Sequence, residues 1–285
     1  MNFSLSKNNI IIGSDDKAIL VDRYLPEHFN GSTVIFVHGY KGFKDWGAWQ
    51  LMAKKFVEKG FAFVLFNFSH NGGTVDQPFD FPDLEAFSKN TYSKELVDLD
   101  TVITDTKEWL SRNNQKSNIS LIGHSRGGGD AILHCSRDNT IHALITWAAI
   151  SDIFSRFPVG QQLQDWEQEG VLHETNTRTK QLMPVRIDIY NDAVKNKKRL
   201  DIGYAAEQIR IPWLIAHGDH DITVPFEEAL FLKSKCASAH LLKIEGGGHT
   251  FGTTHPCSDD ILPQPFQDLV SKSIQFLENT IFIAR

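Results

Sequence analysis

Short apolar runs that are rich in β-branched and aromatic residues recur along this chain of 285 residues. Near-continuous hydrophobicity over such short lengths predicts strands that are buried on both faces of a sheet. From residue 33 onward the runs alternate with stretches at helical spacing, which predicts a mainly parallel sheet wrapped by helices, the α/β class. The predicted strands cover residues 10–12, 18–24, 33–37, 61–66, 119–122, 143–147, 213–216 and 241–244.

Three apolar stripes at a spacing of three or four residues predict helices that pack on this sheet. The stripes are formed by Trp49, Met52, Phe56 and Val57, by Leu96, Leu99, Val102, Ile103 and Leu110, and by Phe266, Leu269, Val270, Ile274 and Leu277. The alternation stops between about residues 151 and 208, where residues 171–174 and 181–185 flank the polar TNTRTK and predict a small hairpin. We therefore expect a single domain over residues 1–285 with a small lid insertion at about 151–208.

The charge balance and the cysteines argue against several classes of function. The chain has Lys+Arg 29, Asp+Glu 35 and a net charge of −6. Its one short basic run, residues 195–199, is typical of a solvated helix end, so no nucleic-acid partner is expected. Three widely spaced cysteines predict neither a disulfide framework nor a CxxC metal site and fit a reduced, cytoplasmic setting. No signal peptide or apolar run of membrane length is recognisable, so no membrane partner is expected.

The stretch LIGHSRGGGD, residues 121–130, places Ser125 between Gly123 and Gly127 directly after a predicted strand. The residues that follow can begin a helix, and the order strand, tight turn, helix is the context of a G-x-S-x-G nucleophile elbow. Small neighbours let the chain turn sharply and expose the serine oxygen, and the helix N-terminus offers unpaired N–H groups to a developing negative charge. The motif alone is as typical of a glycine-rich turn, so its partners decide its meaning.

A serine nucleophile needs a histidine base and a carboxylate that orients this base. His249 stands in the loop EGGGHTF after the predicted strand at 241–244, where glycines leave the loop free to approach the carboxyl edge of the sheet. The stretch HGDHDITVP follows the strand at 213–216 and offers Asp219 and Asp221. The chain order serine, aspartate, histidine is the one expected after such an elbow. We predict a catalytic triad at this edge, with Asp219 and Asp221 as the candidates for its acid.

The sequence VHGYKG, residues 37–42, follows the predicted strand at 33–37 and supplies a fourth element of the same site. A glycine there lets the backbone pass close to a substrate, so the N–H of Tyr40 can point inward. Together with the N–H of Arg126, it would form an oxyanion hole, usually the main source of transition-state stabilisation in acyl transfer.

In combination, GHSRGG, VHGYKGFKDW, HGDHDITVP and GGGHTF strongly resemble the α/β-hydrolase superfamily, and within it bacterial dienelactone-hydrolase-like and feruloyl (cinnamoyl) esterase-like hydrolases. The resemblance covers nearly the whole chain. It implies the α/β-hydrolase fold, an eight-stranded, mostly parallel sheet flanked by helices, with an antiparallel strand from the early hairpin. It also implies Ser125 as nucleophile, Asp221 as acid and His249 as base. Tyr40 and Arg126 would supply the oxyanion N–H groups.

Two departures from these relatives refine the expectation. Many dienelactone-type enzymes use a cysteine nucleophile, so the serine points toward ordinary esters. The stretch NFSHNGG, residues 67–73, stands where many relatives carry an Asp-x-x-Gly-x-Gly loop. We expect His70 in this stretch to be structural, since the mechanism needs no general acid besides His249.

These features predict a serine hydrolase that cleaves a carboxylic ester with a small or aromatic acyl group through an acyl-enzyme. The expected partner is a small-molecule ester, and no cofactor is required. Residues 217–221 contain potential ligands without the HExxH spacing, so no metal is expected. We expect Phe154 and Trp166 of the lid insertion to contact the substrate. Two alternatives remain open: a serine peptidase or acylaminoacyl peptidase, because the same triad cleaves amides, and a non-catalytic ligand-binding relative.

Overall fold

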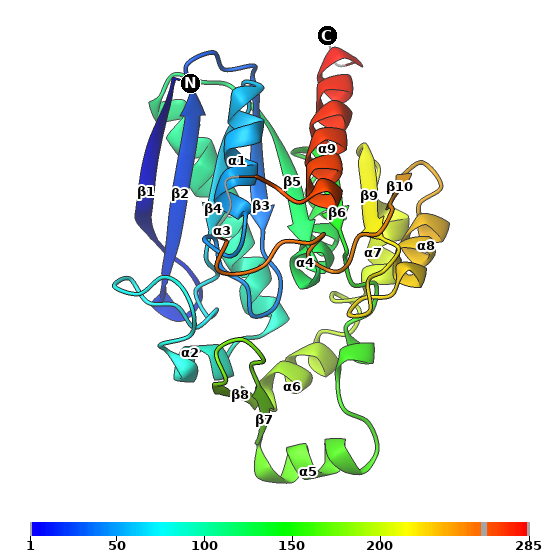
Figure 1. Ribbon diagram of the computed structural model, residues 1–285. Helices are drawn as coiled ribbons and strands as arrows, with labels where there is room; N and C mark the ends of the chain where they lie inside the picture. The colour runs from blue at the N-terminus through cyan, green and yellow to red at the C-terminus, as the bar shows by residue number, and fades with distance from the viewer. Residues whose placement is uncertain (1, 258–260, 284–285) are drawn as a thin grey trace.

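The computed structural model describes residues 2–257 and 261–283 and has an eight-stranded sheet at its centre (Figure 1). The strands are β1 (Phe3–Ile12), β2 (Ala18–Pro26), β3 (Ser32–Val37), β4 (Ala62–Phe66), β5 (Asn118–His124), β6 (Ile141–Trp147), β9 (Trp213–Gly218) and β10 (His240–Ile244). They lie in the order β1-β2-β4-β3-β5-β6-β9-β10. β2 is antiparallel to both neighbours, and the adjacent pairs from β4 to β10 are parallel. The predicted α/β sheet with an antiparallel strand from the early hairpin is therefore confirmed.

All eight predicted strands are present, and the largest difference concerns β1. The sequence predicted a strand only at residues 10–12, whereas β1 begins at Phe3 and most of its side chains are exposed. β1 is an edge strand, so its polar residues can face water on both sides of the sheet. A strand without an apolar run escapes an assignment by hydrophobicity. A short 3-10 turn, η1 (Ser14–Asp16), joins β1 to β2.

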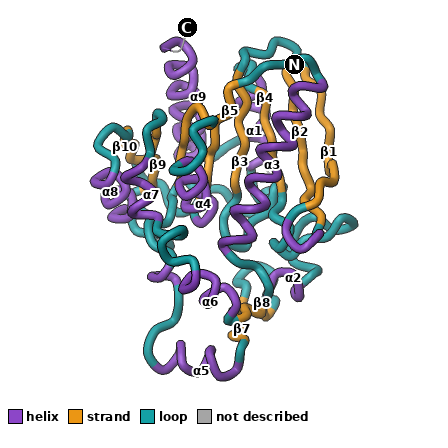
Figure 2. Tube along the Cα trace, turned by 180° about the vertical axis from the view of Figure 1, so that it is seen from behind, coloured by secondary structure: helices purple, strands orange, loops and turns teal. Residues whose placement is uncertain are grey.

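Helices cover both faces of the sheet and enclose a hydrophobic core on each. On the face turned toward the viewer in Figure 1 lie α1 (Trp49–Glu58) and α9 (Gln264–Ile283). On the other face, seen in Figure 2, lie α3 (Tyr92–Arg112), α4 (Arg126–Cys135), α7 (Ile202–Gln208) and α8 (Phe226–Lys235). The apolar stripes predicted for α1, α3 and α9 are buried. Burial of this apolar surface is the main stabilisation of the sheet and its helices.

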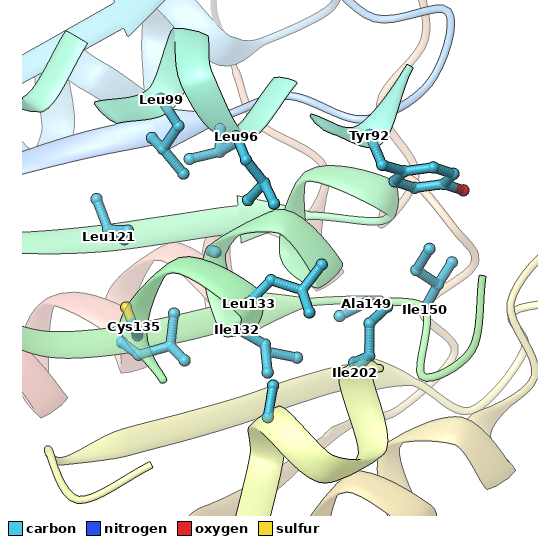
Figure 3. Close-up of a cluster of buried hydrophobic side chains, with 14 of the residues drawn as sticks. Tyr92, Leu96, Leu99, Leu121, Ile132, Leu133, Cys135, Ala149, Ile150 and Ile202 are labelled. Carbon is cyan, nitrogen blue, oxygen red and sulfur yellow. The ribbon is translucent and has the colours of Figure 1, made fainter. Parts of the chain in front are cut away.

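The core behind the sheet brings α3, α4 and α7 together beside β5. Figure 3 shows Leu96 and Leu99 of α3 on one side, Leu133 of α4 between, and Ile202 of α7 on the other. The side chain of Thr91 accepts a hydrogen bond from Lys94 N at 3.3 Å and caps the start of α3. This packing fixes the first turns of α3 and α4 at the end of the sheet where the parallel strands finish.

Short elements replace the strand–helix repeat between residues 151 and 208. They are the 3-10 turn η2 (Phe154–Arg156), α5 (Gln161–Glu169), β7 (Val171–Thr175), β8 (Leu182–Arg186), α6 (Asp188–Lys195) and α7. β7 and β8 pair antiparallel as the small hairpin that the sequence predicted. The elements from α5 to α6 lie beyond the carboxyl ends of the parallel strands, with α2 (Leu84–Ser88) next to β8 (Figure 1). By contrast, α7 packs against α4 and α8 and belongs to the helical layer.

The basic run at residues 195–199 lies at the end of α6. Lys195 is the last residue of that helix, and the basic side chains of the run are exposed. The run is therefore a solvated helix end, as predicted. Within residues 2–257 and 261–283, no helix combines the length and the apolar character needed to cross a membrane.

Candidate active site

Ser125 stands on a sharp turn between the end of β5 and the start of α4. Its backbone has φ 57° and ψ −121°, a region that non-glycine residues rarely adopt and that is strained. Two glycines make this turn possible. A Cβ on Gly123 would lie 2.4 Å from the carbonyl oxygen of Gly127, and a Cβ on Gly127 would lie 2.4 Å from two carbonyl oxygens at the end of β3. The spacing of the G-x-S-x-G motif follows from these close approaches.

A chain of hydrogen bonds links Ser125 to His249 and Asp221. His249 Nε2 lies 3.0 Å from Ser125 Oγ, and His249 Nδ1 lies 2.8 Å from Asp221 Oδ2. Nδ1–H donates to the carboxylate, which leaves Nε2 able to accept the proton of the serine hydroxyl. The three residues come from loops that follow β5, β9 and β10, parallel strands that end at the same edge of the sheet. β9 and β10 are adjacent, and β6 lies between β5 and β9. The structure thus brings the three predicted residues within hydrogen-bond distance.

The two candidate carboxylates, Asp219 and Asp221, have different partners. Asp219 Oδ1 accepts a hydrogen bond from Gly246 N at 2.8 Å, and Lys243 Nζ lies 3.4 Å from its Oδ2. This side chain therefore closes the turn after β10. Asp221 is buried, and its Oδ1 accepts from two backbone N–H groups of its own loop at 2.8 and 2.9 Å while its Oδ2 faces His249. Of the two, it is Asp221 that contacts the histidine.

Donors around Asp221 keep its carboxylate ionised. Burial alone would raise the pKa of Asp221, but hydrogen bonds from His217 and His249, the positive charge of His249 and the N–H of Val224 outweigh it and hold this pKa well below its usual range. His217 Nε2 lies 2.8 Å from Val224 O and 3.5 Å from Asp221 Oδ2. An ionised carboxylate in a fixed position can orient His249 and stabilise its protonated form.

His124, directly before the serine, supports the loop that carries His249. Its Nε2 lies 2.9 Å from the backbone oxygen of His249, and the two ring centroids are 4.9 Å apart. Burial, followed by the charge of His249, lowers the pKa of His124 to about 3. A neutral His124 therefore donates to the carbonyl of His249. The sequence analysis did not identify this residue, and its place inside the G-x-S-x-G motif is the one signal that could have done so.

The N–H groups expected to form an oxyanion hole belong to two segments that meet at Ser125. Gly39 lets the loop after β3 approach the turn, because a Cβ there would lie only 2.9 Å from Ser125 Cβ. Arg126 is the first residue of α4, and the first N–H groups of a helix have no acceptor within the helix. Neither Tyr40 N–H nor Arg126 N–H donates to another residue in the part of the chain that the structure describes. Two backbone donors are thus available near the serine.

A cavity of about 490 Å³ opens onto Ser125 and His249. Residues of the 151–208 segment form its apolar roof, namely Phe157, Pro158, Trp166, Leu172, Val185 and Ile189. Its polar wall includes Tyr40, Arg126 and the ion pair between Lys41 Nζ and Glu174 Oε2, which are 2.7 Å apart. An apolar roof over a polar wall suits a small organic substrate and reduces the access of water.

Of the two residues predicted to contact substrate from the lid insertion, only Trp166 lines this cavity. Trp166 is buried and its Nε1 donates to Val185 O at 2.9 Å. Phe154 does not line the cavity; its ring packs edge-on against Phe157, with centroids 6.1 Å apart, and beside Lys197 Nζ. Phe157, and not Phe154, is the phenylalanine of this segment that lines the cavity. The aromatic residues of the segment indicated that it contacts the substrate, but their presence did not indicate which ring would face the cavity.

The sequence analysis also raised the role of His70 and the possibility of a metal site at residues 217–221; His70 does not line this cavity. The buried His70 contacts Ser69 Oγ through Nδ1 at 2.7 Å and Asp15 Oδ2 through Nε2 at 3.3 Å, and burial lowers the pKa of His70. These contacts join the loop after β4 to η1, in keeping with a structural role. Within the described ranges, no group of three or more His, Cys, Asp or Glu residues is placed to hold a metal ion.

Comparisons with known proteins agree with this architecture. A model of the family described as "Alpha/beta hydrolase family" matches residues 34–259. The fold is similar to that of Est1E from Butyrivibrio proteoclasticus with ferulic acid bound (TM-score 0.72, 17% identity, 97% of this chain and 99% of that chain). It is similar to that of the alpha/beta hydrolase GrgF from Penicillium sp. sh18 (0.71, 15%, 98% and 99%). The acylaminoacyl peptidase of Pyrococcus horikoshii matches over 98% of this chain but 42% of its own length (0.63, 15%).

Proposed function

This chain belongs to the α/β hydrolase family, and from that premise we propose that it is a serine hydrolase that cleaves a carboxylic ester through an acyl-enzyme. The hydrogen-bonded chain Ser125–His249–Asp221 carries the proposal. A serine hydroxyl is a weak nucleophile by itself and becomes reactive when an oriented base removes its proton. Here the base lies 3.0 Å from the hydroxyl oxygen at the floor of a cavity.

In the first half of the reaction, His249 Nε2 takes the proton of Ser125 Oγ while this oxygen bonds to the ester carbonyl carbon. The carbonyl oxygen becomes an oxyanion, which the backbone N–H groups of Tyr40 and Arg126 stabilise. The tetrahedral intermediate then collapses: the bond to the alcohol oxygen breaks, and His249 gives its proton to the leaving alkoxide. The Asp221 carboxylate holds the imidazole and balances its transient positive charge.

In the second half, water replaces the alcohol. The water attacks the acyl carbon while His249 removes its proton, which gives a second tetrahedral intermediate. The bond between the acyl carbon and Ser125 Oγ then breaks, the acid leaves, and His249 returns the proton to Ser125 Oγ. Each step needs only groups of this chain and water. No cofactor enters the proposed cycle.

The cavity supports an ester with a small or aromatic acyl group. Its roof is apolar and includes the rings of Phe157 and Trp166. Transfer of an apolar acyl group from water to such a site is favourable. A volume of about 490 Å³ lies in the usual range for sites that take small organic ligands. Est1E, which shares the fold, binds ferulic acid, an aromatic acid.

Ser125→Ala tests the proposal. We expect turnover of 4-nitrophenyl esters to fall by ~10⁴–10⁶ while the fold is kept, because the nucleophile of a triad is lost. A fluorophosphonate probe should label the native protein at Ser125 and leave this variant unlabelled. Ser136→Ala, at the other end of α4 and away from the cavity, is the matched control and should keep full activity.

The substrate panel separates the proposed ester hydrolase from its rivals. It contains 4-nitrophenyl esters of rising acyl length, feruloyl esters and aminoacyl anilides. Faster cleavage of the anilides than of the esters would favour a serine peptidase. Absence of any turnover and of labelling at Ser125 would favour a non-catalytic relative and would overturn the proposal.

A further inference from the structure

Arg126 has a buried side chain although it directly follows the proposed nucleophile. The side chain is 7% exposed, and its Nε donates to Glu95 Oε2 at 2.8 Å. Glu95 lies on α3 with its side chain 5% exposed, and its Oε1 accepts from Asn90 Nδ2 at 2.7 Å. Arginine and glutamate are rarely buried unless they are paired. Each oxygen of Glu95 has a donor, so the carboxylate is held in one position between α3 and α4.

The guanidinium group of Arg126 also contacts two tyrosine rings. Its Cζ lies 4.0 Å from the ring centroid of Tyr92 and 5.2 Å from that of Tyr40, distances typical of cation–π contacts. Tyr92 begins α3 and stands at the end of the apolar cluster where Ile150 also lies (Figure 3), and both residues line the cavity. Tyr40 lies in the loop after β3. The two proposed oxyanion donors are therefore connected through their side chains.

We propose that Glu95 is a positioning residue, which holds the N–H groups of Arg126 and Tyr40 in place through the Arg126 side chain. This inference rests on the proposed serine-hydrolase function. Glu95 does not line the cavity, so its influence on the reaction passes through Arg126. A buried guanidinium that loses its carboxylate is strongly destabilised and turns toward water. That turn would shift the peptide bond between Ser125 and Arg126 and release the ring of Tyr40, while an oxyanion hole needs donors fixed to within about half an ångström.

A second buried carboxyl group, that of Asp130, provides a natural comparison. Asp130 lies one turn after Arg126 on α4 and is buried, and the guanidinium of Arg126 donates to Glu95 instead. Burial raises the pKa of Asp130 well above its usual value, with the charge of Glu95 adding to the effect. Burial also raises the pKa of Glu95, while the charge of Arg126 and the hydrogen bonds from Asn90 and Arg126 oppose this rise. The hydrogen bond from Arg126 Nε at 2.8 Å makes Glu95 the carboxyl group that holds the guanidinium.

Glu95→Gln and Asp130→Asn test this assignment as a pair of isosteric changes. In Glu95→Gln we expect kcat for a 4-nitrophenyl ester to fall by about 10- to 100-fold, because misplaced donors weaken transition-state stabilisation. KM should change by less than about 3-fold, since substrate binding does not use the oxyanion N–H groups. Affinity for a trifluoromethyl ketone, which forms a tetrahedral adduct on the serine, should fall in parallel with kcat. Asp130→Asn should keep both quantities near those of the native protein.

A control outside the site separates positioning from a general loss of stability. Asp105→Asn breaks another largely buried ion pair of α3, that with Arg23, away from the cavity. It should lower the melting temperature and leave kcat unchanged. An equal kcat loss in Asp105→Asn and Glu95→Gln, or an unchanged kcat in Glu95→Gln, would overturn the inference.

A milder variant keeps the proposal testable if Glu95→Gln does not fold. Asn90→Ala removes one donor from the Glu95 carboxylate and should lower kcat by about 3- to 10-fold with KM nearly constant. An unchanged kcat in Asn90→Ala would then count against the inference. Failure of the native protein to cleave any ester is a different result, which would remove the proposed function itself and this inference with it.

Discussion

Asp219 and Asp221 are the same residue type two positions apart, yet the backbone around them assigns different tasks. Asp219 lies at the surface and accepts from Gly246 N, which closes the turn after β10. Asp221 is enclosed by two N–H groups of its own loop and by His249, and these donors hold its pKa well below its usual range. A buried carboxylate with a full set of donors is the partner that a catalytic imidazole needs.

Asp221→Asn should therefore reduce kcat far more than Asp219→Asn does. An asparagine at 221 can turn an amide N–H toward His249 Nδ1, so the ring takes the tautomer whose Nε2 carries the proton and cannot accept from Ser125. We expect kcat on an ester to fall by ~10³–10⁴ with substrate binding nearly intact. Asp219→Asn should keep kcat within about 3-fold and affect stability instead. Steady-state kinetics on both folded variants measure the two losses. A larger loss of kcat in Asp219→Asn would make Asp219, and not Asp221, the acid of the proposed triad.

Sequence patterns could predict the residues of the proposed triad better than the residues that support them. Ser125, Asp221 and His249 stand in motifs whose spacing follows from strand ends and tight turns, and the structure brings them together. Glu95 escaped notice because its partner on α4 is 31 positions away, and in the sequence it looks like any helical glutamate. The sequence could not show that Phe157, and not Phe154, lines the cavity, because the path of an irregular segment decides which ring faces inward. Contacts between distant segments leave no local pattern to read.

At the scale of elements, buried strands and amphipathic helices could be predicted, and the irregular segment could not. The parallel strands carry continuous apolar runs because helices cover both of their faces, so these strands can be recognised from the sequence. The 151–208 segment adds apolar side chains to the core, but it also contacts the rest through scattered polar contacts, such as the Lys41–Glu174 ion pair and the hydrogen bond from Gln181 Nε2 to Phe81 O. Such contacts have no periodicity. Even so, the hairpin β7–β8 was predictable from its polar turn.

We expect this segment to act as the lid of the acyl site, with Trp166 as the residue that limits acyl length. Trp166→Leu leaves extra space in the roof, so the preference should shift toward longer acyl chains. The ratio of kcat/KM for a long ester to that for acetate should rise by about 10-fold, since each added methylene that the site accepts is worth a few-fold or more. A series of 4-nitrophenyl esters from acetate to decanoate measures this ratio.

Phe154→Leu is the matched control for this prediction. Phe154 stands in the same segment and is also aromatic, but it packs behind Phe157 and does not line the cavity. Its substitution should leave the chain-length profile unchanged. A shift in Phe154→Leu as large as that in Trp166→Leu would mean that general loosening of the segment, and not the volume at Trp166, sets the preference.

At the scale of the whole molecule, the packing around the ends of the parallel strands buries histidines whose pKa is lowered. His38 ends up buried where β3 finishes, with Nδ1 2.9 Å from Gly39 O and Nε2 accepting from Phe68 N at 3.2 Å. With one nitrogen donating and the other accepting, the neutral ring satisfies both partners. A second proton on Nε2 would face the N–H of Phe68. Burial, with a smaller contribution from the charge of Arg126, lowers the pKa of His38 to about 4.

This buried histidine predicts a loss of stability in mild acid. The folded state holds His38 neutral down to about pH 4, whereas the unfolded chain protonates it near pH 6.5, so the unfolded state binds more protons between these values. The contribution of His38 to the free energy of unfolding should therefore be full above about pH 6.5 and fall by about 2 kcal/mol between pH 7 and pH 4.5. Urea unfolding of the native protein and of His38→Asn at pH 7 and pH 4.5 measures this contribution. The difference in free energy of unfolding between the two proteins should be smaller at pH 4.5.

The comparison between the two proteins isolates His38 from groups that titrate alongside it. His124, with a pKa lowered to about 3, acts in the same direction, and Asp130, with its raised pKa, acts in the opposite one. Both are present in the native protein and in the variant, so their contributions cancel in the difference. A constant gap for His38→Asn would show that the imidazole is not kept neutral by the fold, and the buried arrangement at the end of β3 would then have to be revised.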